Sequence, residues 1–180
     1  KNIYSFDSLD FYKKQVELLK KEGCWAFHPK IDESDVDNSL LGKLYKISTP
    51  VIGFFGTSPK QGKFTLQIAV KNMMSKLGYK IGGLATEPSA QLFNFDFSYP
   101  LGYECSVHIS GVKSIQTLNR LMHEIDKKNY DLIIVGSQSQ TVPYNTGNVG
   151  HYPIYQQDFL LGTEPDAVIL CINPFDEIHY

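Results

Sequence analysis

Ten consecutive residues carry the clearest chemical pattern of the sequence, Gly56-Thr-Ser-Pro-Lys-Gln-Gly-Lys-Phe-Thr65. The two glycines allow backbone conformations that other residues avoid, and they let a ligand approach the main chain closely. Lys63 follows the second glycine directly and supplies a positive charge. Where a helix begins at such a place, its amide groups and its dipole favour an anion. We therefore predict a phosphate-binding loop formed by Gly56, Thr57, Ser58, Lys60, Gln61, Gly62, Lys63, Phe64 and Thr65.

The loop is a variant of the Walker A pattern, which has four residues between its glycines and a Ser or Thr after its lysine. Here five residues separate Gly56 from Gly62, and Phe64 stands where the magnesium-binding hydroxyl is expected. Thr65 comes one residue later, which turns it by about 100° around a helix. We predict that the loop binds a phosphate-bearing ligand, with ATP as the first candidate, and depends little on Mg²⁺. No metal site is predicted, and the alternative is a strand–helix turn that binds nothing.

Further polar residues stand just beyond the carboxyl ends of predicted strands, where ligands bind in a parallel sheet. Glu87 follows the second strand and is an acid for a metal or a substrate amine, or else a solvated loop carboxylate. Ser137 opens a long polar loop that we interpret as a substrate lid. His151 in that loop is a candidate general base. The predicted catalytic residues are Lys63, Glu87 and His151, and the predicted substrate-binding residues are Ser137, Gln138 and Ser139.

The elements that must hold these residues alternate between apolar runs and amphipathic stretches. Val51-Ile-Gly-Phe-Phe55 is a continuous apolar run, which is typical of a strand buried on both faces. Strands that alternate with helices predict an α/β class, a three-layer P-loop NTPase-like fold with a mostly parallel sheet. The predicted strands are 51–55, 80–85, 131–135 and 167–172, and the last two are apolar runs that we also expect to be buried. The predicted helices are 64–77, 114–128 and a short one that includes 156–161.

The first 48 residues have a different character. Apolar residues at helical spacing predict a helix over 8–22, with Asp7 as its cap and Gly23 at its end. A polar connection follows, and then a short helix is predicted at 40–45. We interpret 1–48 as an N-terminal helical arm or the remnant of a preceding domain. We interpret 49–180 as a P-loop α/β domain, either whole or truncated at its C-terminus. Aromatic residues alternate with polar ones over 93–99, which predicts a half-buried strand.

Several segments together resemble known P-loop families. The long loop is similar to that of dethiobiotin synthetase and its relatives, which also begin it with Gly-Thr. The sequence is more similar to a bacterial P-loop family that includes D-glutamate N-acetyltransferase. The shared segments are Gly62-Lys63-Phe64-Thr65, a loop like Gly136-Ser-Gln-Ser139, and Gly162-Thr-Glu-Pro165-Asp166 after a leucine-rich stretch.

Two positions depart from that family. Val135 stands where the family has Glu, and Val142-Pro143 stands where it has His-Pro. Neither the acid that would assist a metal nor that histidine carries over to this chain. The resemblance implies a second function, the acyl-CoA-dependent N-acylation of an amino acid, in which the loop would hold a phosphate of acetyl-CoA. Loss of the acid favours this reaction, or a non-catalytic nucleotide-binding module, over a ligase-like or kinase-like reaction with ATP.

Composition narrows the classes of function. The chain has 17 Lys+Arg and 19 Asp+Glu, so its formal net charge is −2. This balance excludes nucleic-acid binding through a strong overall positive field. No apolar run reaches the roughly 20 residues that span a bilayer, and no signal peptide is visible. Three widely spaced cysteines fit a reducing cytoplasm. We expect a cytoplasmic protein that acts on a small molecule without nucleic-acid or membrane contacts, and self-association into a homo-oligomer is left open.

Overall fold

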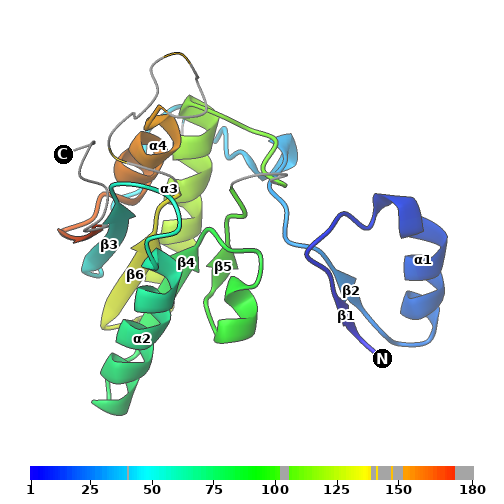
Figure 1. The fold of residues 1–180 in the computed structure, drawn as a ribbon. Coiled ribbons are helices and arrows are strands. Elements are labelled where there is room, and N and C mark those ends of the chain that lie inside the picture. Colours follow the sequence, from blue (N-terminus) through cyan, green and yellow to red (C-terminus); the bar gives the residue numbers. More distant parts are fainter. Residues whose placement is uncertain (40, 102–105, 139–140, 142–146, 148–151, 173–180) are drawn as a thin grey trace.

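A central sheet of five parallel strands organises the chain (Figure 1). The computed structural model describes residues 1–39, 41–101, 106–138, 141, 147 and 152–172. The strands lie in the spatial order β5-β4-β6-β3-β7. Their bounds are Val51–Gly56 for β3, Ile81–Ala85 for β4, Phe97–Ser98 for β5, Leu132–Gly136 for β6 and Ala167–Cys171 for β7.

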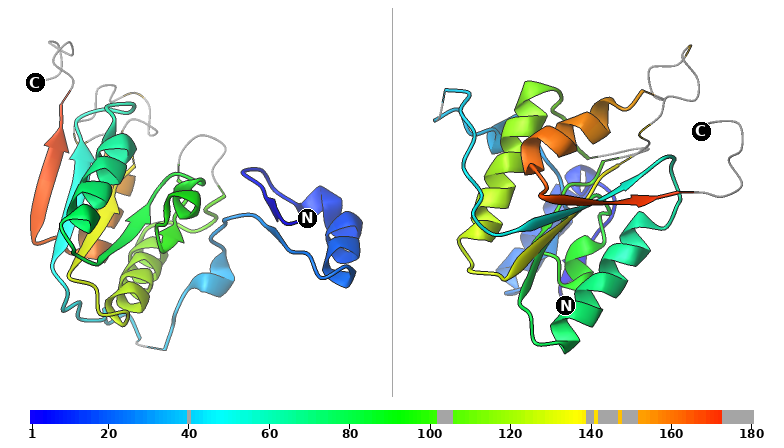
Figure 2. Two further views of the ribbon diagram at one scale, coloured as in Figure 1. Left: turned by 90° about the horizontal axis from the view of Figure 1, so that it is seen from below. Right: turned by 90° about the vertical axis from the view of Figure 1, so that its left-hand side faces the viewer.

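Helices cover both faces of this sheet (Figure 2). One face packs against α2 (Lys63–Lys76), and the other packs against α3 (Val112–Asp126) and α4 (Ile154–Thr163). Because successive side chains of a strand point to opposite faces, Phe54 of β3 joins the α2 side whereas Phe55 joins the α3 side. The predicted three-layer α/β fold with a parallel sheet is confirmed, and the strands predicted at 51–55, 80–85, 131–135 and 167–172 and the helices predicted at 64–77, 114–128 and 156–161 lie within a few residues of the observed ones.

The burial predicted for the last strand is wrong. β7 lies at the edge of the sheet and pairs with β3. Val168 and Leu170 are 49% and 46% exposed. A continuous apolar run indicates a strand, but it does not show whether other elements cover that strand.

The aromatic segment over 93–99 is not the single strand that its alternation predicts. A 3₁₀ helix, η3 (Ala90–Phe93), occupies its start, and Asn94 then takes a left-handed φ of 61°. Asn tolerates this conformation better than most residues, which breaks the extended run. Only Phe97–Ser98 pairs as β5. Phe95 and Tyr99 are buried on opposite faces of the sheet.

The N-terminal region forms a small strand–helix–strand unit. Parallel strands β1 (Ile3–Tyr4) and β2 (Ala26–Phe27) flank α1 (Lys13–Lys21), which a short 3₁₀ turn precedes. The helix therefore begins later than predicted and without the Asp7 cap, while Gly23 follows its end with a φ of 71°. No residue of α1 is buried. The division at residue 48 stays a prediction.

The short helix predicted at 40–45 does not form among the described residues. Leu41 and Gly42 lie in a turn, and 43–48 is irregular. The reason is a side chain on α3: the amide nitrogen of Tyr45 donates to Asn119 Oδ1 at 2.6 Å, and Asn119 Nδ2 donates to the Tyr45 carbonyl at 3.1 Å. These bonds take backbone groups that a helix would use. Within the described part of the chain, no helix is long and apolar enough to cross a membrane.

Candidate functional site

The predicted phosphate loop connects β3 to α2 at the carboxyl edge of the sheet. Gly62 precedes the helix with a φ of 78°, and Lys60 also has a positive φ, of 61°. Glycine is therefore suited to position 62 for conformational reasons. At Gly56 an added Cβ would lie 2.9 Å from Gln61 Oε1 and 3.1 Å from Lys63 Nζ, the ends of two flexible side chains. Both side chains thus lie over the start of the loop.

Neighbouring strands hold the base of this loop. The amide of Thr57 donates to the carbonyl of Cys171, at the end of β7, at 3.1 Å. The carbonyl of Gly56 accepts from both the amide and the hydroxyl of Thr141, each at 3.0 Å. The amide of Ser137 donates to the carbonyl of Phe54 at 3.1 Å. The ends of β3, β6 and β7 are therefore tied together at the predicted site.

Lys63 is half-buried at the first position of α2. Its ammonium group donates to the carbonyl of Ser58 at 3.2 Å. Burial lowers the pKa of Lys63, while the neighbouring Cys171 and Glu87 act in the opposite direction. Glu87, which is exposed at the end of β4, is therefore electrostatically coupled to the loop lysine. A phosphate beside this ammonium group would offset the cost of its burial.

Gln61 lies across the loop. Its Nε2 donates to Thr57 Oγ1 at 2.8 Å and to Ser58 Oγ at 2.7 Å. Its Oε1 is buried and accepts no hydrogen bond from any described residue. A buried acceptor without a donor costs about 1–3 kcal/mol. The loop thus carries an unsatisfied acceptor beside its lysine.

The first turn of α2 supplies further donors. Within the helix, the amide of Leu66 bonds to the carbonyl of Gly62, which leaves the amides of Phe64 and Thr65 for another acceptor. The ring of Phe64 points into the apolar layer and packs against Phe93 and Phe95, with ring centroids 5.8 and 5.7 Å away. Phe64 therefore has only a backbone group to offer a phosphate, whereas the side chain of Thr65 is exposed.

The other predicted residues are placed only in part. Ser137 is buried at the end of β6, and Gln138 beside it is half-buried. The hydroxyl of Ser137 donates to the carbonyl of Phe54 at 3.4 Å. Ser139 and His151 lie outside the described residues, as does most of the predicted lid. Their roles in substrate binding and base catalysis stay predictions.

Three residues near the loop were missed by the sequence reasoning. Gln156 of α4 donates through Nε2 to Thr141 Oγ1 at 2.7 Å, and so links that helix to the residue that binds Gly56. Gln67 of α2 is buried against the end of β6, where an added Cβ on Gly136 would lie 2.3 Å from Gln67 Oε1. Cys171 ends an apolar strand. No local sequence signal marks any of the three, because long-range packing brings them together.

Two side chains that usually hold magnesium beside a phosphate loop are replaced by apolar ones in this chain. Phe64 has no oxygen to offer, and Val135 is fully buried in the apolar layer of β6. Among the described residues, no group of three or more His, Cys, Asp or Glu side chains could hold a metal ion. The donor set of this edge suits an anion, through amides, hydroxyls and one ammonium group.

A family model described as "Domain of unknown function (DUF1611_C) P-loop domain" matches residues 39–179. The chain belongs to this family. The match begins nine residues before the division predicted at residue 48. It supports a P-loop fold of the nucleotide-binding type around the loop over 56–65. Residues 1–38 lie outside it. A search of curated proteins gave no significant match.

Solved structures of two proteins are similar to this DUF1611 chain. The crystal structure of a DUF1611 family protein from Anabaena variabilis has a TM-score of 0.58 and 14% identity, covering 82% of this chain and 38% of that one. This chain thus spans well under half the length of that protein, and the likeness shows the fold. A mutant of the Mycobacterium tuberculosis APS kinase CysC has a TM-score of 0.36 and 15% identity, with 72% and 80% covered. The narrower resemblance to D-glutamate N-acetyltransferase and dethiobiotin synthetase stays a prediction.

Proposed function

We propose that this DUF1611 domain binds a phosphate-bearing ligand, with ATP as the first candidate, in the loop over 56–65 and acts on a small molecule. One observation carries the proposal. A left-handed Gly62 starts α2 beside a half-buried Lys63, at the carboxyl edge of a parallel sheet. The amides of Phe64 and Thr65, the helix dipole and the ammonium group all favour an anion there.

The ligand is held without much help from magnesium. In the usual site the metal neutralises phosphate charge through a hydroxyl after the lysine and an acid at the end of a neighbouring strand. Phe64 and Val135 occupy those positions here, and neither side chain can take part. We expect slow hydrolysis or none. Lys63 and the loop amides then stabilise the charge of the bound phosphate.

A second reaction class fits the same loop. In an acyl-CoA-dependent N-acyltransferase, the loop would hold a phosphate of acetyl-CoA, and the polar end of β6 would hold an amino acid. The observation in favour is that the polar side chains of Ser137 and Gln156 lie together beside the loop, with Ser137 Oγ 3.5 Å from Gln156 Oε1. This pair offers a substrate polar contacts and offers a metal no negative charge.

Ligand-dependent melting distinguishes these functions. Unfolding temperatures are measured with ATP, ADP and acetyl-CoA, each with and without Mg²⁺. A ligand at 100 times its Kd adds about 2.7 kcal/mol of stability, which is a readily measured shift. Stabilisation by ATP that needs no Mg²⁺ supports the first function, and stabilisation by acetyl-CoA alone supports the second. The proposal fails if none of the three ligands raises the melting temperature.

A further inference from the structure

A cleft of about 860 Å³ lies between the N-terminal unit and the sheet domain, and no residue of the loop over 56–65 lines it. Small-molecule sites commonly have volumes of about 300–1,000 Å³ and often lie between two parts of a chain. One wall is the face of α1 that carries Lys13, Glu17 and Lys20, at helical positions i, i+4 and i+7. The opposite wall includes Arg120 of α3.

Arg120 is the only arginine among the 180 residues. Its side chain is 27% exposed. Its Nε donates to the carbonyl of Asp35 at 3.1 Å, while its Nη2 lies 3.9 Å from Asp35 Oδ1, beyond hydrogen-bond distance. No described residue accepts a hydrogen bond from its Nη groups. A planar guanidinium with such donors matches the two oxygens of a carboxylate or phosphate.

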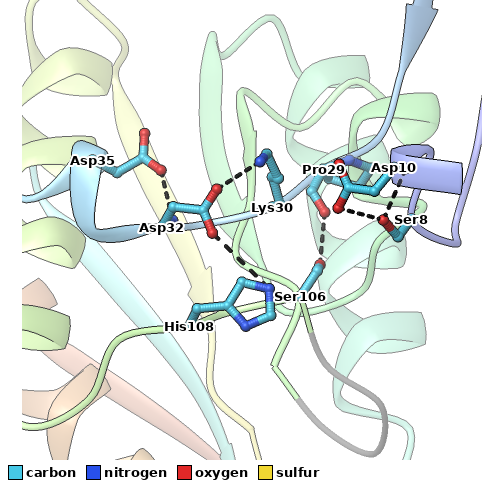
Figure 3. A network of polar contacts seen from close by, with 8 residues as sticks. All are labelled: Ser8, Asp10, Pro29, Lys30, Asp32, Asp35, Ser106 and His108. Atoms are coloured by element: carbon cyan, nitrogen blue, oxygen red, sulfur yellow. Dashed lines mark hydrogen bonds and ion pairs between the residues drawn. The ribbon is translucent and has the colours of Figure 1, made fainter. Parts of the chain in front are cut away.

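Three of the acids around the cleft already have partners (Figure 3). Asp32 Oδ2 lies 2.6 Å from Lys30 Nζ. Asp35 Oδ2 accepts from the amide of Asp32 at 2.8 Å. Asp10 Oδ2 accepts from the hydroxyl of Ser8 at 2.9 Å, and this bond is the main reason that the pKa of Asp10 is lowered. These carboxylates keep their negative charge, which Lys30 balances at Asp32 and which the nearby Arg120 offsets at Asp35.

The cations on the facing wall are less engaged. Neither Lys13 nor Lys20 forms a salt bridge with any described residue, although Lys13 lies near enough to Asp10 to help lower its pKa. Glu17 is the one acid on their face of α1. Lys13 and Lys20 on the same helix and Arg120 on the opposite wall carry positive charge. The cleft is lined by four acids and four cations, and the cationic donors without a close carboxylate partner among the described residues are Lys13, Lys20 and the Nη groups of Arg120.

We propose that this cleft binds the oxyanion of a small molecule, a carboxylate or a phosphate ester, at a site separate from the phosphate loop. Arg120 donates two parallel hydrogen bonds to the oxyanion, and Lys13 and Lys20 contribute charge from the facing wall. The body of the molecule lies against Val16, Phe97 and Leu121, which supply apolar surface in the same cleft.

The single arginine makes the site directly observable. Phenylglyoxal modifies the guanidinium group of arginine, so mass spectrometry follows Arg120 alone. The probes are inorganic phosphate and succinate, which separate phosphate from carboxylate recognition. We expect at least one of them to slow the modification of Arg120 severalfold, with the same protection in Lys63→Met. The proposal is overturned if neither probe protects, or if protection disappears in Lys63→Met.

Calorimetry of the protecting probe assigns the contacts. Arg120→Gln should weaken binding about 10–100-fold, the scale of charge-assisted hydrogen bonds. Lys13→Met and Lys20→Met, which alter exposed helix positions, should each weaken it about 2–5-fold. Lys76→Met on α2 is the matched control and should leave the affinity unchanged. Equal affinities for all four variants and the unaltered chain would overturn the proposal. A failure here leaves the ATP and acetyl-CoA melts unaffected, so the two proposals fail independently.

Discussion

Two strand–helix–strand units of this chain share the same local order and differ in what surrounds them. In β1–α1–β2 the two parallel strands pair with each other, whereas β3–α2–β4 contributes its strands to a five-stranded sheet with β6 between them. In the first unit no residue of α1 is buried, and in the second Phe54 and Leu84 are fully buried. Parallel strands need cover on both faces to be stable. The comparison teaches that the local sequence pattern forms the elements, whereas neighbouring elements bury them.

The difference extends to the two proposed sites. The phosphate loop is fixed at its base by hydrogen bonds from Thr57, Thr141 and Ser137 to neighbouring strand ends. The N-terminal unit, which forms one wall of the cleft, contacts the sheet domain through the hydroxyl of Tyr4, which lies 2.7 Å from the carbonyl of Pro88 and 3.3 Å from Oε1 of Gln91 in η3. We therefore expect backbone geometry to dominate binding in the loop and side-chain charge to dominate in the cleft.

The largest expected effect is in the packed layer between α3, α4 and the sheet. Phe159 is fully buried, and its ring centroid lies 5.5 Å from that of Tyr99. Phe159→Ala removes this contact and leaves a cavity, so the free energy of unfolding should fall by about 3–5 kcal/mol. Urea melts followed by circular dichroism measure it. A loss below about 1 kcal/mol would mean that the sheet domain is no better packed than the N-terminal unit.

The Lys63→Met variant tests whether Lys63 contributes to ligand binding or to the stability of the sheet domain. Affinity for the phosphate ligand should fall by about 1.5–3 kcal/mol, the scale of a hydrogen bond to a charged group. The unliganded variant should be as stable as the unaltered chain near neutral pH, or slightly more stable, because burial of the ammonium group is unfavourable. Calorimetric titration and urea melts test both, with Lys76→Met as control. Unchanged binding together with lost stability would make Lys63 a structural residue.

The same variant has a pH signature. The pKa of Lys63 is lowered in the folded chain from an ordinary 10.5, so the unfolded chain binds more protons between the two values. Stability of the unaltered chain should rise relative to Lys63→Met as the pH increases through that interval. A difference that stays constant up to pH 10.5 would show that burial does not act on this ammonium group.

The fold was predictable where the hydrophobic pattern of the sequence and the positions of its glycines indicate the same element. The strand predicted at 51–55 and the helix predicted at 64–77, which stand on either side of the loop, both formed as expected. The two-residue strands β1 and β2 were missed because such short segments carry no period, and β5 is much shorter than the strand predicted over 93–99. The helix expected at 40–45 failed because Asn119, 74 residues away from Tyr45, takes the backbone groups that it needed.

The candidate site also has a part that the sequence predicts and a part that only the structure shows. A phosphate loop is local, since Gly56 and Lys63 lie within eight residues, and their spacing alone predicts where an anion would lie. Gln156 and Cys171 reach the loop only through the order of strands in the sheet. Arg120 faces Lys13 across a cleft that forms between distant parts of the chain. No window of sequence contains that pair, so side-chain sites of this kind need the structure.

Gln61→Ala should have a smaller effect, of opposite sign to that of Lys63→Met. The side-chain Nε2 of Gln61 donates to the hydroxyls of Thr57 and Ser58. Its Oε1 is buried over the start of the loop and has no donor among the described residues. A phosphate that must displace this side chain binds more tightly once it is removed, by about 0.5–1.5 kcal/mol. Calorimetry tests this, with the exposed Gln157→Ala as control. Weaker binding would show instead that Gln61 contacts the phosphate.

The smallest effect is expected at the N-terminal unit, in Phe11→Ser. Phe11 is 92% exposed, so its ring is already in water and its loss removes almost no buried surface. The free energy of unfolding should change by less than about 0.5 kcal/mol, as at other exposed sites away from special features. Urea melts at two protein concentrations tenfold apart measure it. A loss above about 2 kcal/mol at both concentrations would mean that another part of the same chain covers this ring. A loss that appears only at the higher concentration would mean that a second copy covers it, since association stabilises by mass action. Either result would break the contrast between the two strand–helix–strand units, because the 3₁₀ turn that holds Phe11 and precedes α1 would then be covered in solution.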